Sequence, residues 1–207
     1  MRTIEKTIYQ FSELSEAAKE KAREWYRRAG DGDTCFSELV IEDAATIAEL
    51  FGLDIRQELL KSGNYAPSVL WRGFYSQGDG AAFAGKYSYK KGALKAVKEY
   101  APIDTELHRI VKSLQKAQST VFYRAECTTK ASGFYSTCTA VDCSYVSDQY
   151  RALPVAVESA IVQAMRDFAA WIYRQLEAEY DYQNADEQID EMIEANEYEF
   201  DDTGARA

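Results

Sequence analysis

The stretch VLWRGFYSQGDGAAFAGKYSY, residues 69–89, decides the expected fold class. Its halves, 69–76 and 82–89, are rich in aromatic and other strand-forming residues. The link between them is short enough to join them as an antiparallel hairpin. Glycine tolerates positive φ and aspartate favours turns, so a turn by itself accounts for Gly78-Asp79-Gly80. The sequence therefore predicts a β-hairpin here.

The same link, Gln77, Gly78, Asp79 and Gly80, is also a candidate ligand-binding loop. Small residues let a ligand approach the backbone, and Asp79 supplies a carboxylate. A phosphate cradle would normally lead into the N-terminus of a helix, whereas a strand is expected after this link. The link is thus interpreted as a turn, with a contact loop for a polar ligand or partner as the alternative.

Helices and a second hairpin are expected in the rest of the chain, which predicts an α+β fold with an antiparallel sheet packed against several helices. The second hairpin joins residues 120–129 to 134–145, and a short strand is expected at 53–60. The first helix is expected to begin after Ser15 and end at Gly30, and the second to bury Leu39. Helices are expected at about 15–29, 35–51, 91–100, 105–118 and 154–182, with a last one opening at Asn184 in a capping-box-like start.

The chain of 207 residues is long enough for one sizeable core. We expect residues 1–182 to form a single α+β domain and residues 183–207 to form an acidic helix and tail. That last helix places Ile189, Met192 and Ile193 on one side, which indicates that it docks on the body of the protein.

The formal charge of −10 is concentrated at the C-terminus. Residues 177–207 carry twelve acidic residues and one basic residue, which leaves 22 acidic and 23 basic residues for the rest of the chain. The candidate partner-binding residues are therefore the acidic side chains of the last helix. They are Asp186, Glu187, Asp190, Glu191, Glu194 and Glu197.

A cluster of lysines, the basic run, lies between residues 86 and 98. Lys86 and Lys90 are the candidate ligand-binding residues, and Lys91, Lys95 and Lys98 follow them in the sequence. Aromatic residues are interleaved with this run, so a base could stack beside the lysines. The aromatic residues concerned are Tyr87, Tyr89 and Tyr100.

Several classes of function have no signature in the sequence. There is no P-loop, no H-E-x-x-H, no G-x-S-x-G and no G-x-G-x-x-G. The four cysteines form no C-x-x-C pair, and the single histidine, His108, has no partner at motif spacing. We therefore expect no cofactor, metal or catalytic residue, no apolar run long enough to span a membrane, and a cytoplasmic protein.

The chain resembles a family of largely uncharacterised proteins of tailed phages and prophages over nearly its whole length. The segments that carry the resemblance are IYQFSELSEAAKEKAREWYR, FYSQGDGAAFAGKYSY, AVKEYAPIDTELHRI and WIYRQLEAEYDYQNADEQIDEMIEANEYEF. Some members of that family are labelled antitoxin of a toxin-antitoxin stability system. The resemblance implies an accessory phage gene product acting in the cytoplasm of a bacterial host, and it carries over no catalytic residues.

Three functions follow as hypotheses. The first is an inhibitor or antitoxin-like protein that binds a host or anti-phage defence protein, with the acidic helix imitating the phosphate-lined surface of nucleic acid. Such a protein would not itself bind nucleic acid. The second is a binder of a small anionic or nucleotide ligand, and the third is an enzyme of unrecognised type.

The second hairpin also predicts a pair of neighbouring thiols. If Ser132-Gly133 forms a two-residue turn, Cys127 lies opposite Cys138. In a reducing cytoplasm these two cysteines are expected to remain thiols in an apolar contact. A longer loop through residues 129–133 is the alternative and would shift the register.

Overall fold

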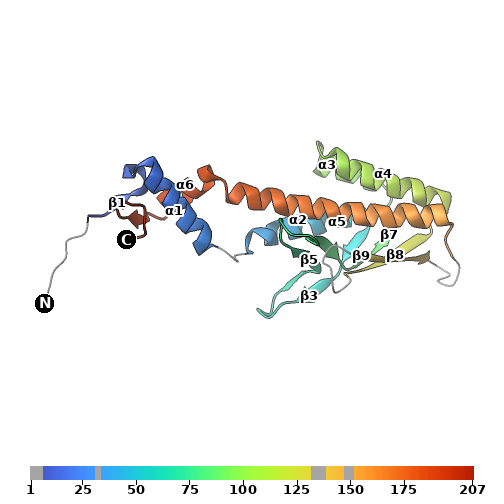
Figure 1. The fold of residues 1–207 in the computed structure, drawn as a ribbon. Coiled ribbons are helices and arrows are strands. Elements are labelled where there is room, and N and C mark those ends of the chain that lie inside the picture. Colours follow the sequence, from blue (N-terminus) through green and yellow to red (C-terminus); the bar gives the residue numbers. More distant parts are fainter. Residues whose placement is uncertain (1–6, 31–33, 132–138, 147–151) are drawn as a thin grey trace. The chain divides into compact units, whose positions relative to one another are not determined.

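The protein has an α+β fold, as predicted from its sequence (Figure 1). The computed structural model describes residues 7–30, 34–131, 139–146 and 152–207. The chain divides into two compact units. The terminal unit comprises residues 1–36 and 178–207, and the central unit comprises residues 37–177.

The central unit is built around an antiparallel four-stranded sheet of order β2-β7-β8-β9. The strands are β2 (Leu53–Ile55), β7 (Gly85–Ser88), β8 (Ala125–Ala131) and β9 (Thr139–Tyr145). Two further hairpins pair β3 (Gln57–Leu59) with β4 (Tyr65–Pro67) and β5 (Val69–Arg72) with β6 (Gly80–Phe83). The predicted strand at 53–60 is therefore two strands in different sheets.

Helices α2 (Phe36–Leu50), α3 (Ala93–Tyr100) and α4 (Thr105–Thr120) belong to this unit, apart from Phe36, together with most of α5 (Val155–Gln183). Phe168 of α5 lies at the centre of the core, with its ring 5.0 Å from that of Phe51 and 5.7 Å from that of Phe83. Leu39, which was expected to be buried on α2, is 76% exposed. This prediction was wrong because the inward stripe of α2 runs through Ala44, Ile47 and Ala48 instead.

The predicted hairpin of residues 69–89 is present, with a narrower pairing. Val69 lies opposite Phe83 and Arg72 opposite Gly80, so the loop runs from residue 73 to residue 79. After Ala84 the chain enters β7, which pairs with β2 and β8 and not with β5.

The predicted register of the second hairpin was wrong. Ala131 lies opposite Thr139, and Cys127 therefore lies opposite Cys143 and not Cys138. The connection is longer than a two-residue turn because β9 begins at Thr139. Cys138 itself lies outside the described residues, as does the rest of the segment 132–138.

The terminal unit brings together both ends of the chain. It contains β1 (Tyr9–Gln10), a 3-10 turn η1 (Phe11–Glu13), α1 (Glu16–Ala29), α6 (Asp186–Ala195) and β10 (Glu199–Phe200). Tyr9 pairs with Phe200 across the β1–β10 ladder. As predicted, Ser15 caps α1 by accepting a hydrogen bond from the backbone of Ala18, and Gly30 ends the helix.

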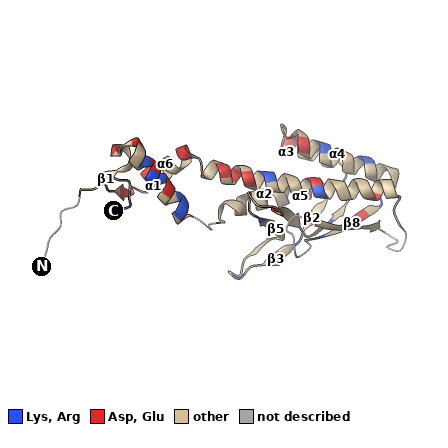
Figure 2. Cartoon of the chain, viewed as in Figure 1, with Lys and Arg blue, Asp and Glu red and all other residues tan. Residues whose placement is uncertain are grey.

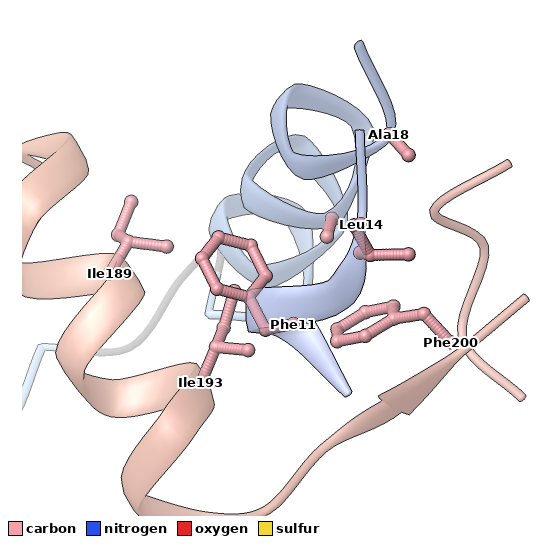
Figure 3. Packing of buried hydrophobic residues seen from close by; sticks show 7 residues of the cluster. Phe11, Leu14, Ala18, Ile189, Ile193 and Phe200 are labelled. Atoms are coloured by element: carbon pink, nitrogen blue, oxygen red, sulfur yellow. The ribbon is translucent and has the colours of Figure 1, made fainter. Parts of the chain in front are cut away.

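A small apolar core fills this terminal unit (Figure 3). Ile189 and Ile193 of α6 pack with Phe11 and with the small side chains of α1, and Phe200 closes the cluster. Met192, which was expected on the same apolar side, is 46% exposed. The expected cap at Asn184 is also absent: α6 begins at Asp186, and Ala185 in the N-cap position provides no side-chain hydrogen bond.

This division of the chain differs from the expected boundary between residues 182 and 183. The acidic helix packs on α1 through its isoleucines, and residues 1–36 group with it. By sequence count, the terminal unit carries 18 acidic and 8 basic residues, while the central unit carries 16 of each. The whole formal charge of −10 thus belongs to the terminal unit. Figure 2 colours the acidic and basic residues that the structure describes.

Candidate ligand-binding cavity

The central unit contains a cavity of about 470 Å³ between the sheet and helices α3 and α4. This volume lies in the range of pockets that hold small organic ligands. Four segments contribute to it: the end of α2, strand β7 with the turn after it, α3, and one face of α4. Its lining residues are Phe51, Tyr87, Tyr89, Lys90, Gly92, Ala93, Leu94, Lys95, Lys98, Glu99, Val111, Leu114 and Gln115.

The floor of the cavity is mainly apolar and is buried. Phe51, Tyr87, Val111 and Leu114 are each at most 2% exposed. Burial raises the pKa of the Tyr87 hydroxyl well above its usual range, while a hydrogen bond with Gln118 opposes that shift. Tyr87 is therefore neutral at physiological pH and presents no negative charge to a ligand.

Three of the lining residues are lysines. The ammonium group of Lys90 donates a hydrogen bond of 2.7 Å to the carbonyl oxygen of Glu49, which holds this side chain against the end of α2. Lys95 forms an ion pair with Glu99 one turn later, with 3.6 Å between the charged atoms. Lys98 has no ion-pair partner in the part of the chain that the structure describes. After Glu99 neutralises one lysine, the lining retains a net positive charge.

An aromatic pair extends the cavity wall. The ring of Tyr89, which lines the cavity, lies 4.3 Å from the ring of Tyr123 at an angle of 34°. The backbone of Tyr123 and its neighbour Phe122 is left-handed, with φ of 60° and 53°. This conformation is uncommon for bulky residues and is often found at functional sites.

The buried side chain of Gln118 holds this turn in place. Its amide donates a 2.7 Å hydrogen bond to the carbonyl oxygen of Ala125 and accepts a 3.2 Å hydrogen bond from the same residue's N–H. The N–H of Tyr123 in turn donates to the carbonyl oxygen of Gln118 at 2.8 Å. The end of α4 and the start of β8 are thereby locked together, which fixes Tyr123 beside Tyr89.

Only one of the predicted ligand-binding residues lines this cavity, namely Lys90. Lys86 alternates with Tyr87 along β7 and is exposed, so it lies on the opposite face of the sheet. Tyr100, named with the basic run, does not line the cavity and hydrogen-bonds to Asp43, which raises the pKa of its hydroxyl.

The predicted loop of Gln77, Gly78, Asp79 and Gly80 does not line the cavity either. The carboxylate of Asp79 accepts hydrogen bonds from the backbone N–H groups of Tyr75 and Ser76 at 3.0 and 2.6 Å. Gly78 has a φ of 96°, as a turn position that favours glycine does. Asp79 therefore closes the β5–β6 loop from within, in accord with the turn interpretation.

The six predicted partner-binding residues divide into two groups. Asp190 receives two 2.7 Å hydrogen bonds from the guanidinium of Arg23, and Asp186 pairs with Arg27, so both join α6 to α1. The hydrogen bond to Asp190 raises the pKa of Arg23. The other four, Glu187, Glu191, Glu194 and Glu197, are exposed.

Sequence reasoning noted Lys95 and Lys98 but missed the floor of the cavity. Phe51 follows α2, whereas Val111 and Leu114 lie on α4, and each reads as an ordinary core residue. No spacing pattern connects Phe51 with α4, so only the tertiary structure brings these residues together. Tyr123 was missed for the same reason, because its partner Tyr89 lies 34 residues earlier.

No cluster of three or more histidine, cysteine, aspartate or glutamate residues with the geometry of a metal site occurs among the described residues. Within the same ranges, no helix has both the length and the apolar character required to cross a membrane.

The fold and the cavity define an α+β protein with a small-molecule-sized pocket in its central unit. The chain belongs to the family described as a domain of unknown function (DUF8835), which matches residues 36–186. The match spans the central unit and leaves most of the terminal unit outside it. Comparison with curated proteins gave no match, and comparison with solved structures gave none either.

Proposed function

We propose that the central unit binds a small anionic ligand that carries a flat ring, of the nucleotide class, in the cavity beside α3. The observation that carries the proposal is the convergence of Lys90, Lys95 and Lys98 around an aromatic, apolar floor. The central unit as a whole carries 16 acidic and 16 basic residues, so these lysines are a local feature and not part of a general basic surface.

The polar side of the cavity suits a phosphate or carboxylate. Lys90 and Lys98 can each donate charged hydrogen bonds to such a group. The cavity is also lined by Gly92, Ala93 and Leu94, where α3 begins, and the N-terminal end of a helix favours negative charge. An anion in this cavity would therefore be attracted both by the lysine ammonium groups and by the N-terminal end of α3.

The aromatic side suits a flat ring. Tyr89 is held by Tyr123, so its ring is already oriented before a ligand arrives. Stacking on a fixed aromatic side chain contributes about 1 to 3 kcal/mol per base in other proteins. A ligand that combines a ring with an anionic group would use both sides of the cavity at once.

The test is isothermal titration calorimetry with AMP, adenosine and inorganic phosphate as separate probes. We expect AMP to bind more tightly than either of its parts. Lys98→Ala is expected to weaken AMP binding by about tenfold, because a charged hydrogen bond contributes about 1.5 kcal/mol or more. Tyr89→Ala should weaken the binding of AMP and adenosine but leave that of phosphate unchanged.

Lys91→Ala provides the matched control, since Lys91 belongs to the same basic run but does not line the cavity. Equal losses for Lys91→Ala and Lys98→Ala would indicate a diffuse electrostatic effect. Failure of AMP, adenosine and phosphate to bind at millimolar concentration would contradict the proposal for nucleotides.

A second candidate function is that of a phage accessory protein that binds and inhibits a host or anti-phage defence protein, as an anti-defence inhibitor or an antitoxin-like protein. The resemblance of the sequence to phage proteins motivates it, and the concentration of the net charge in the terminal unit favours it. Glu187, Glu191 and Glu194 are exposed at spacings of four and three residues, so they share one face of α6. This stripe is suited to a basic groove on a partner protein.

Capture of partners from a bacterial lysate by the tagged protein tests this second candidate. The triple substitution Glu187→Gln, Glu191→Gln and Glu194→Gln should reduce capture of a specific partner, and added salt should reduce it too. The triple variant Glu38→Gln, Glu42→Gln and Glu49→Gln makes the same change of charge on exposed positions of α2 and serves as the control. If the α6 variant captures the partner as well as the unchanged protein does, these three glutamates do not bind it.

A further inference from the structure

Two cysteines lie directly opposite one another on neighbouring strands of the four-stranded sheet. Cys127 on β8 is paired in register with Cys143 on β9. Both carry free thiols in this structure. Their place in the ladder determines how near to each other the side chains lie, because opposed pairs in antiparallel sheets are of two alternating kinds.

A hydrogen bond at the end of the ladder fixes which kind this pair is. The N–H of Val146 donates to the carbonyl oxygen of Arg124 at 2.9 Å, so these two residues form a hydrogen-bonded pair in the same register. Hydrogen-bonded and non-hydrogen-bonded pairs alternate along the ladder. Three steps further on, Cys127 and Cys143 form a non-hydrogen-bonded pair.

Side chains of a non-hydrogen-bonded pair are closer together than those of the other kind. Their Cα atoms are typically about 4.5 Å apart, which lies inside the range of about 4.4 to 6.8 Å found across disulfides. A disulfide between these two residues therefore requires only a small adjustment of the backbone. Cys127 and Cys138, the pair expected from the sequence, do not share this register.

The two thiols differ in environment. Cys127 is 2% exposed and lies opposite Tyr87 of β7, whereas Cys143 is half-buried on the edge strand β9. A hydrogen bond from the Cys127 thiol lowers the pKa of Cys143, and the same hydrogen bond together with burial raises the pKa of Cys127. Cys143 is thus the accessible nucleophile, and Cys127 is the thiol held behind it.

We propose that Cys127 and Cys143 are a redox-active pair, which a small uncharged hydroperoxide converts to an intramolecular disulfide. The assignment rests on the register and on the position of the pair in the ladder. It is independent of the ligand proposed for the cavity.

The reaction balances with one hydroperoxide per pair. The thiolate of Cys143 attacks one peroxide oxygen, the O–O bond breaks, and the products are a sulfenic acid at Cys143 and, after uptake of a proton, water or an alcohol. The sulfur of Cys127 then attacks the sulfenic sulfur and loses its proton, and hydroxide leaves as a second water. The two thiols are oxidised by two electrons, and the peroxide is reduced by the same two.

Charges around the pair favour an uncharged oxidant. Asp142 and Glu158 place negative charge near Cys143, and this charge acts to raise the pKa of its thiol. Glutathione disulfide carries a net negative charge and would be repelled there, while hydrogen peroxide would not. Hydrogen peroxide is therefore the probe of choice.

The experiment uses the full-length chain with Cys35→Ala and Cys138→Ala, which leaves only the proposed pair. Treatment with a small excess of hydrogen peroxide should remove both thiols, lower the mass by two hydrogens and be reversed by dithiothreitol. Adding Cys143→Ser to this variant should abolish the cross-link and leave Cys127 largely unreacted, because it is buried. Circular dichroism before and after treatment checks that the fold is retained.

The wild-type chain provides a test that needs no substitution. Trypsin cleaves after Arg124 and Lys130, and the protease Asp-N cleaves before Asp142 and Asp148, so Cys127, Cys138 and Cys143 fall on three separate peptides. After oxidation we expect the peptide of Cys127 to be linked to that of Cys143. A link from Cys127 to Cys138, or addition of oxygen to Cys143 with no link to Cys127, would overturn the proposal.

Discussion

The terminal and central units obtain their stability from different sources. In the central unit a four-stranded sheet and long helices enclose aromatic side chains such as Phe51, Phe83 and Phe168. The terminal unit has two short helices, a two-residue ladder and a core of seven buried residues. It also holds the whole net charge of the protein. A small core that must overcome charge repulsion is expected to be the weaker of the two.

Ion pairs and cation–π contacts add stability to the terminal unit, whose apolar core is small. Arg23 and Arg27 of α1 bind Asp190 and Asp186 of α6, and Arg206 lies over the rings of Trp25 and Tyr198 at 5.6 and 4.6 Å. All of these contacts join residues more than 150 positions apart, apart from the one with Tyr198. The acidic helix is therefore first a structural element, and its outward glutamates are the residues available to a partner.

The largest expected effect comes from removing one core phenylalanine in each unit. Phe200→Ala and Phe168→Ala should each cost about 3 to 5 kcal/mol, because both side chains are fully buried among other rings. In hydrogen exchange followed by mass spectrometry, Phe200→Ala should remove protection from α1 and α6 and leave the sheet protected. Phe168→Ala should do the reverse. Loss of protection throughout the chain in both variants would show that the two units unfold as one.

A glycine in the terminal unit gives the next largest effect. Gly204 has a φ of 85°, and a Cβ placed there would lie 2.0 Å from the carbonyl oxygen of Ala18. Gly204→Ala should therefore destabilise the terminal unit by at least about 2 kcal/mol, from backbone strain together with the clash. Gly63→Ala in the central unit has a similar φ of 87° with open space around it and should cost about 1 kcal/mol. Equal midpoints in urea denaturation for the two variants would contradict the close contact between Gly204 and the carbonyl oxygen of Ala18.

The ion pair between the helices of the terminal unit is expected to contribute less. Asp190→Asn should cost about 1 to 2 kcal/mol, because it breaks a two-point contact with Arg23, whose side chain is 14% exposed. Glu187→Gln changes the same charge on the solvent side of α6 and should change stability by less than about 0.5 kcal/mol. Thermal unfolding of the two variants distinguishes the structural acids from the exposed ones, and equal stabilities would mean that the pair is only a surface contact.

The smallest effect concerns pH and the central unit. Hydrogen bonds from Ser68 and Arg56 lower the pKa of Glu58 below its ordinary value of 4.5. The contribution of this carboxylate is thus present above pH 4.5 and is lost as the pH falls through its folded pKa. Because 44% of the Glu58 side chain is exposed and solvent screens its contacts, its contribution should be below about 0.5 kcal/mol. When the free energy of unfolding is measured against pH, Glu58→Gln should slightly reduce its fall on the acid side. An unchanged pH dependence would show that solvent screens these contacts completely.

The sequence predicted the elements well where local signals were strong. The caps of α1 define that helix almost to the residue, and α5 begins and ends within one residue of its expected bounds of 154 and 182. The register of β8 and β9 was predicted wrongly because Ser132-Gly133 has the composition of a two-residue hairpin turn. In the structure the pairing begins at Ala131 and Thr139. Charge patterning located the acidic helix, but it could not separate Asp190 from Glu187, since only packing against α1 makes that distinction.

The cavity was predicted only in part. Lys90 and Tyr89 lie in a segment whose basic and aromatic composition suggested a ligand, and this local signal was visible. The remaining walls depend on how α4 packs over the sheet, which is a property of the tertiary structure alone.

The pairing of Tyr9 with Phe200 has a consequence for synthesis on the ribosome. The helix α1 ends at Ala29, and its partners α6 and β10 follow it from Asp186 onward, while the ribosome adds about 5 to 20 residues per second. The whole of the central unit is translated in the interval and can begin to fold, while the apolar side of α1 still lacks its cover. The nascent chain therefore exposes Phe11 and Leu14 for many seconds, and a chaperone that recognises short apolar segments would find its binding site there.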